Sequence, residues 1–385
     1  MTQQNGDIVA QTTDLAREIQ TRRKALGLTQ ADLATAVGFS VAQIVSDIER
    51  GQRDVKAWEL VKIADALRTT VDRLLGISER ESPARVMWRR ESAAGSRDVE
   101  ELFLDRAHRF ALLEKWNGLP PPPELPQREL DPEATSFADV ARMALSVARV
   151  LDLGSRPAVS LAAVLQEGFR IKLFFESLGE DESAASARGD FGYAVLMNAG
   201  QAPWRRNYNL AHELFHLVTW DSTQQAWSRE GDQPRWHEHV ERLANAFASH
   251  LLLPAEEMEA QHRERFAERE IDYGDLVEMA REFEVSTEAL VWRFRLMGKL
   301  TQEEAEGILN DPEFRKEDRR TMPDYWGSTP EGPLPQRYWR LALNAYRRGE
   351  LSLGRLARML EVSVSEAGAI VMTQENEQQA TAASA

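Results

Sequence analysis

The sequence predicts an α+β protein in which helices predominate, with a helical N-terminal domain followed by a larger domain that contains a small sheet. Most of the 385 residues follow the 3.6-residue periodicity of amphipathic helices. Two short apolar runs, 171–178 and 191–198, instead favour strands. Four consecutive prolines, Pro120–Pro123, interrupt both patterns and predict an extended spacer between the two parts of the chain.

The first domain is predicted to span residues 14–77, after a loose N-terminal tail. Thr29 and Ser40 each stand at the N-cap position of a helix, and Gly38 ends the helix between them. The five predicted helices are 14–26, 30–37, Ser40 to Gly51, 55–67 and 70–75.

The rest of the chain is predicted to contain a second domain with flanking segments. A helical connector over 84–118 leads to the proline-rich linker 119–134, where we place the main domain boundary. Residues 135–300 form the second domain, in which strand 191–198 pairs with strand 171–178 across a polar loop. Its predicted helices are 137–151, 159–167, 207–219, 234–253, 273–283 and 286–297. A helical region over 301–373 and a disordered tail over 374–385 follow.

The composition limits the chemistry and the location of the protein. The chain has no cysteine, so a bound metal must use histidine and carboxylate ligands. No stretch approaches the ~18 to 20 apolar residues that cross a bilayer, and the N-terminus lacks a secretory signal, so we expect a cytoplasmic protein without membrane contact. The net charge is −15, but residues 1–80 hold 11 basic and 11 acidic residues, so any DNA contact should lie there.

The stretch AHELFH, residues 211–216, is a HExxH motif. Residues four apart share a face of a helix, so His212 and His216 can direct their ring nitrogens at one metal ion. Glu213, one step round the helix, can reach the water that the metal activates and act as general base. The pattern is typical of a zinc peptidase.

A catalytic zinc site also needs a third protein ligand. Four candidates lie on the predicted helix 234–253, namely His237, Glu238, His239 and Glu241. Glu241 is favoured because it lies at the edge of the apolar stripe, whose burial against the HExxH helix would carry the carboxylate towards the metal. His237, one turn earlier on the same face, is the second choice. Asn245, one turn after Glu241, can hydrogen-bond a metal-binding histidine.

The stretches NLAHELFH and ERLANAFA, the latter followed by LLLP, resemble the ImmA/IrrE family of metallopeptidases. In that family HExxH is followed by E-x-x-A-N-x-F-A and a Leu-Leu-Met-Pro-like end. The likeness covers about 135–300. It implies a zincin-like domain with zinc on His212, His216 and Glu241, and with Glu213 as the base.

In the expected mechanism, zinc polarises the scissile carbonyl, and Glu213 takes a proton from water and passes it to the leaving amine. Strand 191–198 is expected to be an edge strand beside the metal that aligns an extended substrate. Spacing does not choose among four candidates for the oxyanion-stabilising residue, namely Tyr208, Arg205, His237 and His239.

Residues 29–51 resemble the helix-turn-helix of XRE (Cro/repressor-type) proteins, through TQADLA, the turn at Gly38 and IERG. The resemblance implies DNA binding. The predicted base-reading residues are Ser40, Gln43 and Ser46. The predicted phosphate contacts are Gln30, Arg50, Arg53 and Lys56. A homodimer is expected because it doubles the phosphate contacts of a domain without net charge. The alternative is a helical bundle that serves dimerisation or protein docking.

These features predict a DNA-binding regulatory zinc metalloendopeptidase that cleaves a transcriptional repressor or another regulator, in a stress response or on a mobile element. Two alternatives stay open. In one, the protein is an XRE-type transcriptional regulator whose peptidase-like domain only senses a ligand or metal. In the other, it is a protease toxin or phage-defence effector, and its expression arrests growth unless Glu213 is changed.

Overall fold

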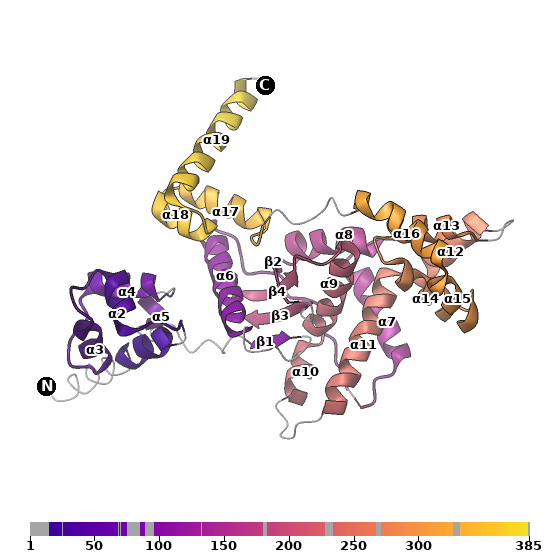
Figure 1. Ribbon diagram of the computed structural model, residues 1–385, viewed down its shortest axis with the longest axis horizontal. Coiled ribbons are helices and arrows are strands. Elements are labelled where there is room, and N and C mark those ends of the chain that lie inside the picture. Colours follow the sequence, from indigo (N-terminus) through magenta and orange to yellow (C-terminus); the bar gives the residue numbers. More distant parts are fainter. Residues whose placement is uncertain are drawn as a thin grey trace. The chain divides into compact units, whose positions relative to one another are not determined.

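The computed structural model describes residues 15–24, 26–67, 69, 71–74, 85–88, 96–131, 133–179, 183–227, 234–266, 271–325 and 332–383. It confirms an α+β fold in which helices predominate (Figure 1). The chain divides into two compact units, one made of residues 1–84 and 94–106 and the other of residues 85–93 and 107–385. Among the described helices, none combines the length and apolar character that a bilayer crossing requires.

The N-terminal unit contains a bundle of short helices. A helical stretch over 15–24 precedes α2 (Gln30–Val37), α3 (Gln43–Glu49), α4 (Ala57–Ala66) and α5 (Val71–Leu74). Their apolar faces share one core, which includes Ile19, Leu33, Val37, Val45, Ile48, Ile63 and Leu67.

Local signals explain where α2 begins and ends. Thr29 caps α2 in a reciprocal capping box with Asp32, and Gly38, with φ of 85°, takes the left-handed conformation that ends the helix. The predicted cap at Ser40 is wrong, because α3 begins after Ala42 and has no side-chain cap. Phe39 packs against the core of the bundle, and Ser40 lies in the bend that follows it, before α3.

The second unit is built on a four-stranded sheet with the order β1-β3-β4-β2. The strands are β1 (Arg85–Trp88), β2 (Lys172–Glu176), β3 (Ala184–Gly189) and β4 (Gly192–Asn198). Strands β2 and β4 run parallel, whereas β3 is antiparallel to both β4 and β1.

The sheet differs from the prediction in three respects. The predicted polar loop between 171–178 and 191–198 contains β3, whose small residues have weak strand propensity but pair with β4 along their whole length. Residues 85–88 of the predicted helical connector form β1. Because β4 lies between β3 and β2, the predicted edge strand 191–198 is an interior strand.

Helices cover both faces of the sheet (Figure 1). On one face, Phe110 of α6 (Ser96–Trp116) meets Phe174 and Tyr338 edge-on, at ring-centroid distances of 6.1 and 5.2 Å. On the other, α9 (Pro203–Val218) packs on β3 and β4, and α11 (Pro234–Leu252) packs against α9 and α7 (Phe137–Val150).

The proline-rich segment 119–134 is part of the second unit and not a spacer, so the predicted boundary there is wrong. Leu125 and Leu130 are buried in the core of this unit. The amide of Arg128 donates to the carbonyl of Val218. Arg170 donates to the carbonyls of Pro120 and Pro121. Burial of the two leucines and satisfaction of these backbone groups hold the segment against the core.

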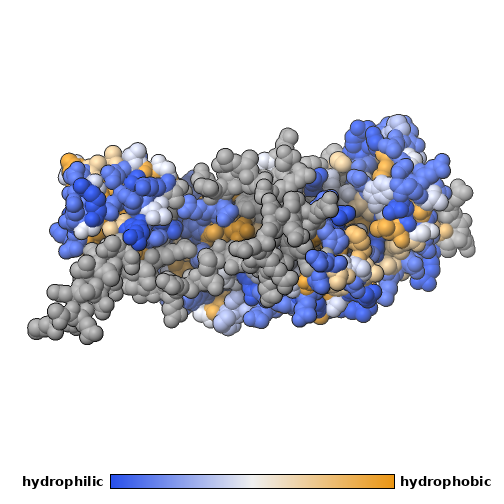
Figure 2. All heavy atoms as spheres, turned by 90° about the horizontal axis from the view of Figure 1, so that it is seen from below, coloured by the Kyte–Doolittle hydropathy of each residue, from blue (hydrophilic) through white to orange (hydrophobic). Residues whose placement is uncertain are grey.

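The remaining helices of the second unit are α8 (Pro157–Ala163), its π-helical continuation (Val164–Gly168), α10 (Trp220–Trp227), α12 (Ala255–Phe266), α13 (Tyr273–Glu282), α14 (Thr287–Leu296), α15 (Gln302–Asn310), α16 (Pro312–Tyr325), α17 (Gln336–Arg347), α18 (Leu353–Leu360) and α19 (Val364–Ala383). The disordered tail predicted over 374–385 is wrong as far as Ala383, because glutamine, glutamate and alanine favour a continued helix. Figure 2 shows mainly hydrophilic residues on the described surface of one face, consistent with 28% charged residues.

Candidate metal centre

The AHELFH stretch lies in the buried part of α9. Pro203 occupies the first turn, where a proline fits, and the helix runs unbroken to Val218. His212 and Glu213 are at most 1% exposed, and His216 is 6% exposed. The Nε2 atoms of His212 and His216 lie 3.2 Å apart, so the helical spacing of four residues brings both rings to one point.

Glu241 reaches the same point from α11. Its Oε2 lies 3.2 Å from Nε2 of His212, and its Oε1 lies 3.3 Å from Nε2 of His216. The apolar stripe of α11, which includes Leu243 and Phe247, is buried, and Glu241 lies at its edge. Among the described residues, these two histidines and this glutamate are the one cluster of three potential metal ligands.

The spacing of the three donor atoms fits a tetrahedral zinc ion. Imidazole and carboxylate ligands lie about 2.0 to 2.1 Å from zinc, and at tetrahedral angles two such ligands are about 3.3 Å apart. The three donor-to-donor distances here are 3.2, 3.2 and 3.3 Å. Two imidazoles and a carboxylate are also a ligand set found in catalytic zinc sites.

The carboxylate of Glu241 is held in its charged form. Burial opposes ionisation, but the hydrogen bonds from His212 and His216 outweigh burial and keep the pKa of Glu241 far below its usual value. A charged carboxylate that faces two imidazoles is electrostatically suited to a cation.

Asn245 orients the first histidine. Its Oδ1 lies 3.1 Å from Nδ1 of His212, and the hydroxyl of Tyr208 donates to the same Oδ1 at 3.2 Å. An amide oxygen accepts a hydrogen from Nδ1, which leaves Nε2 of His212 as the nitrogen that faces Glu241.

Glu213 points from α9 towards the sheet, where the hydroxyl of Ser186 donates to its Oε2. Both residues are buried, at 1% and 0% exposure. Ser186 was missed at the sequence level because its segment was predicted to be a loop. Only recognition of β3 as a strand that packs on α9 would have placed this hydroxyl beside Glu213.

The other sequence candidates lie away from the cluster or have other contacts. His237 and Glu238 are exposed, and the ring of His239 lies against that of Phe137 at 6.2 Å. Of the residues considered for the oxyanion, Arg205 is exposed, whereas Tyr208 contacts the centre through Asn245.

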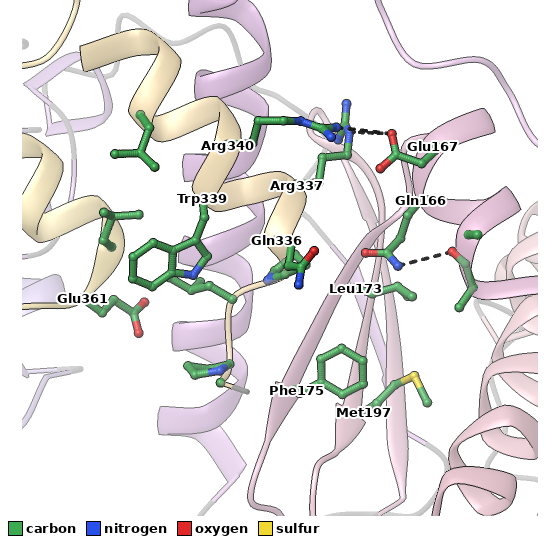
Figure 3. A pocket seen from close by; sticks show the side chains of 18 of the residues that line it. Gln166, Glu167, Leu173, Phe175, Met197, Gln336, Arg337, Trp339, Arg340 and Glu361 are labelled. Atoms are coloured by element: carbon green, nitrogen blue, oxygen red, sulfur yellow. Dashed lines mark hydrogen bonds and ion pairs between the residues drawn. The ribbon is translucent and has the colours of Figure 1, made fainter. Parts of the chain in front are cut away.

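A cavity of about 1480 Å³ lies between β2, the π-helical turn and α17 (Figure 3). Leu173 and Phe175 form part of an apolar wall, and Glu167 pairs with Arg337 and Arg340 at 3.8 and 3.5 Å. None of the three potential metal ligands lines this cavity.

In the N-terminal unit, the predicted base-reading residues lie on and before α3. Ser40 and Gln43 are exposed, and Ser46 is partly buried. Gln43 donates to Asp47 at 2.8 Å, and Arg50 pairs with the same carboxylate at 2.7 Å. Asp47 therefore lowers the positive potential that Arg50 would present to a phosphate.

The predicted phosphate contacts differ in how far they are engaged inside the unit. Gln30 donates to Glu49 at 2.8 Å, and Arg53 pairs with Glu59 at 2.7 Å. Lys56, at the start of α4, is exposed.

Glu49 forms a buried ion pair that sequence reasoning did not predict. Its carboxylate accepts hydrogen bonds from Arg23 at 2.5 and 3.0 Å, and the two side chains are 0% and 9% exposed. Burial raises the pKa of Glu49, but the hydrogen bonds from Arg23 and Gln30 outweigh burial and lower it overall. The pair connects the helical stretch 15–24 to α3.

A helix-turn-helix bundle on the same chain as a HExxH helix and a converging glutamate defines a regulatory DNA-binding protein with a peptidase-like domain. Residues 166–295 match the peptidase family model described as the IrrE N-terminal-like domain, and residues 14–75 match a helix-turn-helix domain model. The chain thus contains an IrrE N-terminal-like peptidase domain and a helix-turn-helix domain, which confirms the predicted resemblance to the ImmA/IrrE family and to XRE-type helix-turn-helix proteins.

Two solved structures are similar to parts of the chain. A Mycobacterium tuberculosis transcriptional regulator is 16% identical with a TM-score of 0.31, over 49% of this chain and 51% of that one. The apo form of ComR from S. Thermophilus is 10% identical with a TM-score of 0.17, over 81% of this chain and 99% of that one. The chain thus spans about half the length of the first structure. No curated protein matches it.

Proposed function

We propose that the protein is a zinc metalloendopeptidase that acts on a transcriptional repressor or another regulatory protein. The observation that carries the proposal is the triangle of donor atoms from His212, His216 and Glu241, with edges of 3.2, 3.2 and 3.3 Å. These residues would hold the ion, which would supply Lewis-acid polarisation of the scissile carbonyl and acidify water.

Glu213 is the proposed general base. It adjoins His212 in the sequence, and its buried carboxylate accepts a hydrogen bond from the hydroxyl of Ser186. In that position it takes a proton from the attacking water and passes the proton to the leaving amine. Asn245 keeps the ring of His212 in the orientation that presents Nε2.

The N-terminal unit binds DNA in this proposal, with Ser40, Gln43 and Ser46 at base edges. Gln30, Arg50, Arg53 and Lys56 are the proposed phosphate contacts. A homodimer is also proposed. It is supported by Trp58 and Val61 of α4, which are 53% and 51% exposed and lie one turn apart on the same face.

A regulator bound to DNA is the proposed substrate because the same chain carries a helix-turn-helix domain and a peptidase-like domain. Tethering a peptidase to an operator raises its effective concentration near proteins bound at that operator. Cleavage would then be favoured near the operator, which suits limited proteolysis of a regulator in a stress response or on a mobile element.

The test compares the wild-type chain with Glu213→Gln, and uses Glu238→Gln, an exposed carboxylate on α11, as the matched control. Zinc content, cleavage of a mixture of internally quenched peptides, and transcription from the protein's own promoter are measured for each. Glu213→Gln should keep its zinc and lose cleavage, and transcription should change with it. Unchanged transcription in Glu213→Gln would instead favour the regulator that only senses a ligand or metal. Growth arrest that requires Glu213 would favour the toxin.

A further inference from the structure

Strand β1 lies at the one edge of β3 that β4 does not occupy. It pairs antiparallel with β3, and Met87 stands opposite Ser186 in the register. Only four residues form the strand. It belongs to the second unit, although the residues before it, 1–84, and after it, 94–106, belong to the first.

The side chain of Met87 lies on the same face of the sheet as the candidate metal centre. Residues directly opposite in an antiparallel pair project to the same side, and Ser186 projects to Glu213 on α9. Met87 is 3% exposed and belongs to the same core as Leu214 of α9. The backbone of β1 therefore runs beside the strand that contacts the proposed base.

An extended substrate would be expected at this same edge. Peptides bind to sheets by adding a strand to an edge, through main-chain hydrogen bonds and alternate side-chain pockets. Strand β3 contacts Glu213 through Ser186, and α9 packs on β3 and β4. At the other edge of the sheet, the amide of Phe175 in β2 donates to the carbonyl of Pro333.

We propose that β1 is an autoinhibitory strand that occupies the position of an extended peptide substrate beside β3. This inference rests on the proposed peptidase function and deepens it. Cleavage requires β1 to leave, and the substrate segment then pairs antiparallel with β3. The segment places an apolar side chain in the space that Met87 fills. Because both flanks of β1 belong to the DNA-binding unit, an event in that unit can act on β1 through the chain.

The experiment uses a fluorescein-labelled peptide with the sequence of residues 83–90 as the probe, and it is run first on metal-free protein. The variant Val86→Pro/Met87→Pro removes the amide hydrogens of two adjacent residues of β1. Because successive amides of a strand point to opposite sides, one of the two faces β3. The variant Val86→Cys/Ala187→Cys joins an opposite pair in a chain that has no other cysteine, and oxidation locks β1 in place.

The proline variant should bind the peptide at least about tenfold more tightly than the wild type, because β1 no longer competes with the peptide for the edge of β3. The oxidised cysteine variant should bind less than the wild type and recover on reduction. Equal binding by the locked and reduced forms would overturn the proposal. Met87→Ala keeps all backbone groups and is used if the two prolines prevent folding. This variant must also bind the peptide more tightly than the wild type.

Zinc content and cleavage of quenched peptides are then measured on the same variants. Cleavage should follow the order of peptide binding and disappear when Glu213→Gln is added. If the variants bind the peptide in the predicted order but take up no zinc, the proposed peptidase function is contradicted, whereas the displacement of β1 by a peptide is still supported. If the oxidised Val86→Cys/Ala187→Cys variant cleaves peptides as fast as the wild type, the autoinhibitory role of β1 is contradicted, whereas the proposed peptidase function is still supported.

Discussion

Nδ1 of His212 lies 3.1 Å from Oδ1 of Asn245, so a side chain on α11 sets the orientation of a ring on α9. Glu241 lies one turn before Asn245 on the same helix. One face of α11 therefore supplies both a potential ligand and the group that directs another potential ligand.

Replacement of Asn245 by alanine is expected to weaken zinc binding by about 10 to 100-fold, because His212 loses the acceptor that fixes its ring. Competition with a chromophoric chelator measures the zinc affinity. Ser249→Ala, one turn further along α11, is the control and should bind like the wild type. Equal affinity in Asn245→Ala and the control would show that Asn245 does not orient a ligand.

Replacement of Ser186 by alanine is expected to lower kcat by about 10 to 100-fold, because a hydrogen bond to a charged group contributes about 1.5 to 3 kcal/mol and 1.4 kcal/mol is a factor of ten. Zinc content and KM should change little, since Ser186 contacts Glu213 and no potential ligand. Ser186→Thr keeps the hydroxyl and should restore most of the rate. An unchanged kcat in Ser186→Ala would remove the serine from the catalytic arrangement.

Removal of Glu49 is expected to destabilise the N-terminal unit by about 3 to 5 kcal/mol, because Arg23 is left buried without its partner. Hydrogen exchange of amides in α2 to α4, measured in the full chain, reports this loss for Glu49→Ala. The double variant Arg23→Met/Glu49→Leu removes both charges and should recover much of the protection. If Glu49→Ala exchanges like the wild type, the ion pair does not hold the bundle.

His250 of α11 makes stability depend on pH. Burial, followed by the charge of Arg293, lowers the pKa of His250 from its usual 6.5 to about 4. The unfolded chain therefore binds the proton more tightly, and the free energy of unfolding falls as the pH drops from about 6.5 to about 4.

The loss from His250 is on the order of 2 kcal/mol after allowance for its partial exposure. Urea unfolding at pH 7 and at pH 5 measures it, and His250→Gln should lose less stability between the two pH values than the wild type. The same loss in both proteins would exclude His250 as the cause.

Helical periodicity was sufficient to predict which side chains come together at the candidate centre. His212 and His216 share a face of α9, and the apolar stripe of α11 carries Glu241 and Asn245 to that face. That His212, His216 and Glu241 bind a metal ion, and that Asn245 orients one of these ligands, stay predictions. The helix cap at Thr29 was likewise predicted from the sequence, because the signal for a cap is local; its reciprocal capping box with Asp32 was not predicted.

Features that depend on long-range pairing could not be predicted from the sequence. Ser186 lies in a strand of small residues, which form a strand because β4 and β1 pair with them. Strand β1 has only four residues and gains its order from β3. The four prolines are typical of an extended spacer. Only the packing of the folded chain shows that Leu125 and Leu130 of this segment are buried in the core.

The most direct test of the account is zinc titration of the full chain beside Glu241→Ala and Glu238→Ala. The wild type and Glu238→Ala should each bind one zinc ion per chain tightly, and Glu241→Ala should bind at least about 100-fold more weakly because only two protein ligands remain. A wild-type chain that binds no zinc, or a Glu241→Ala variant that binds zinc as tightly as the wild type, would contradict the account.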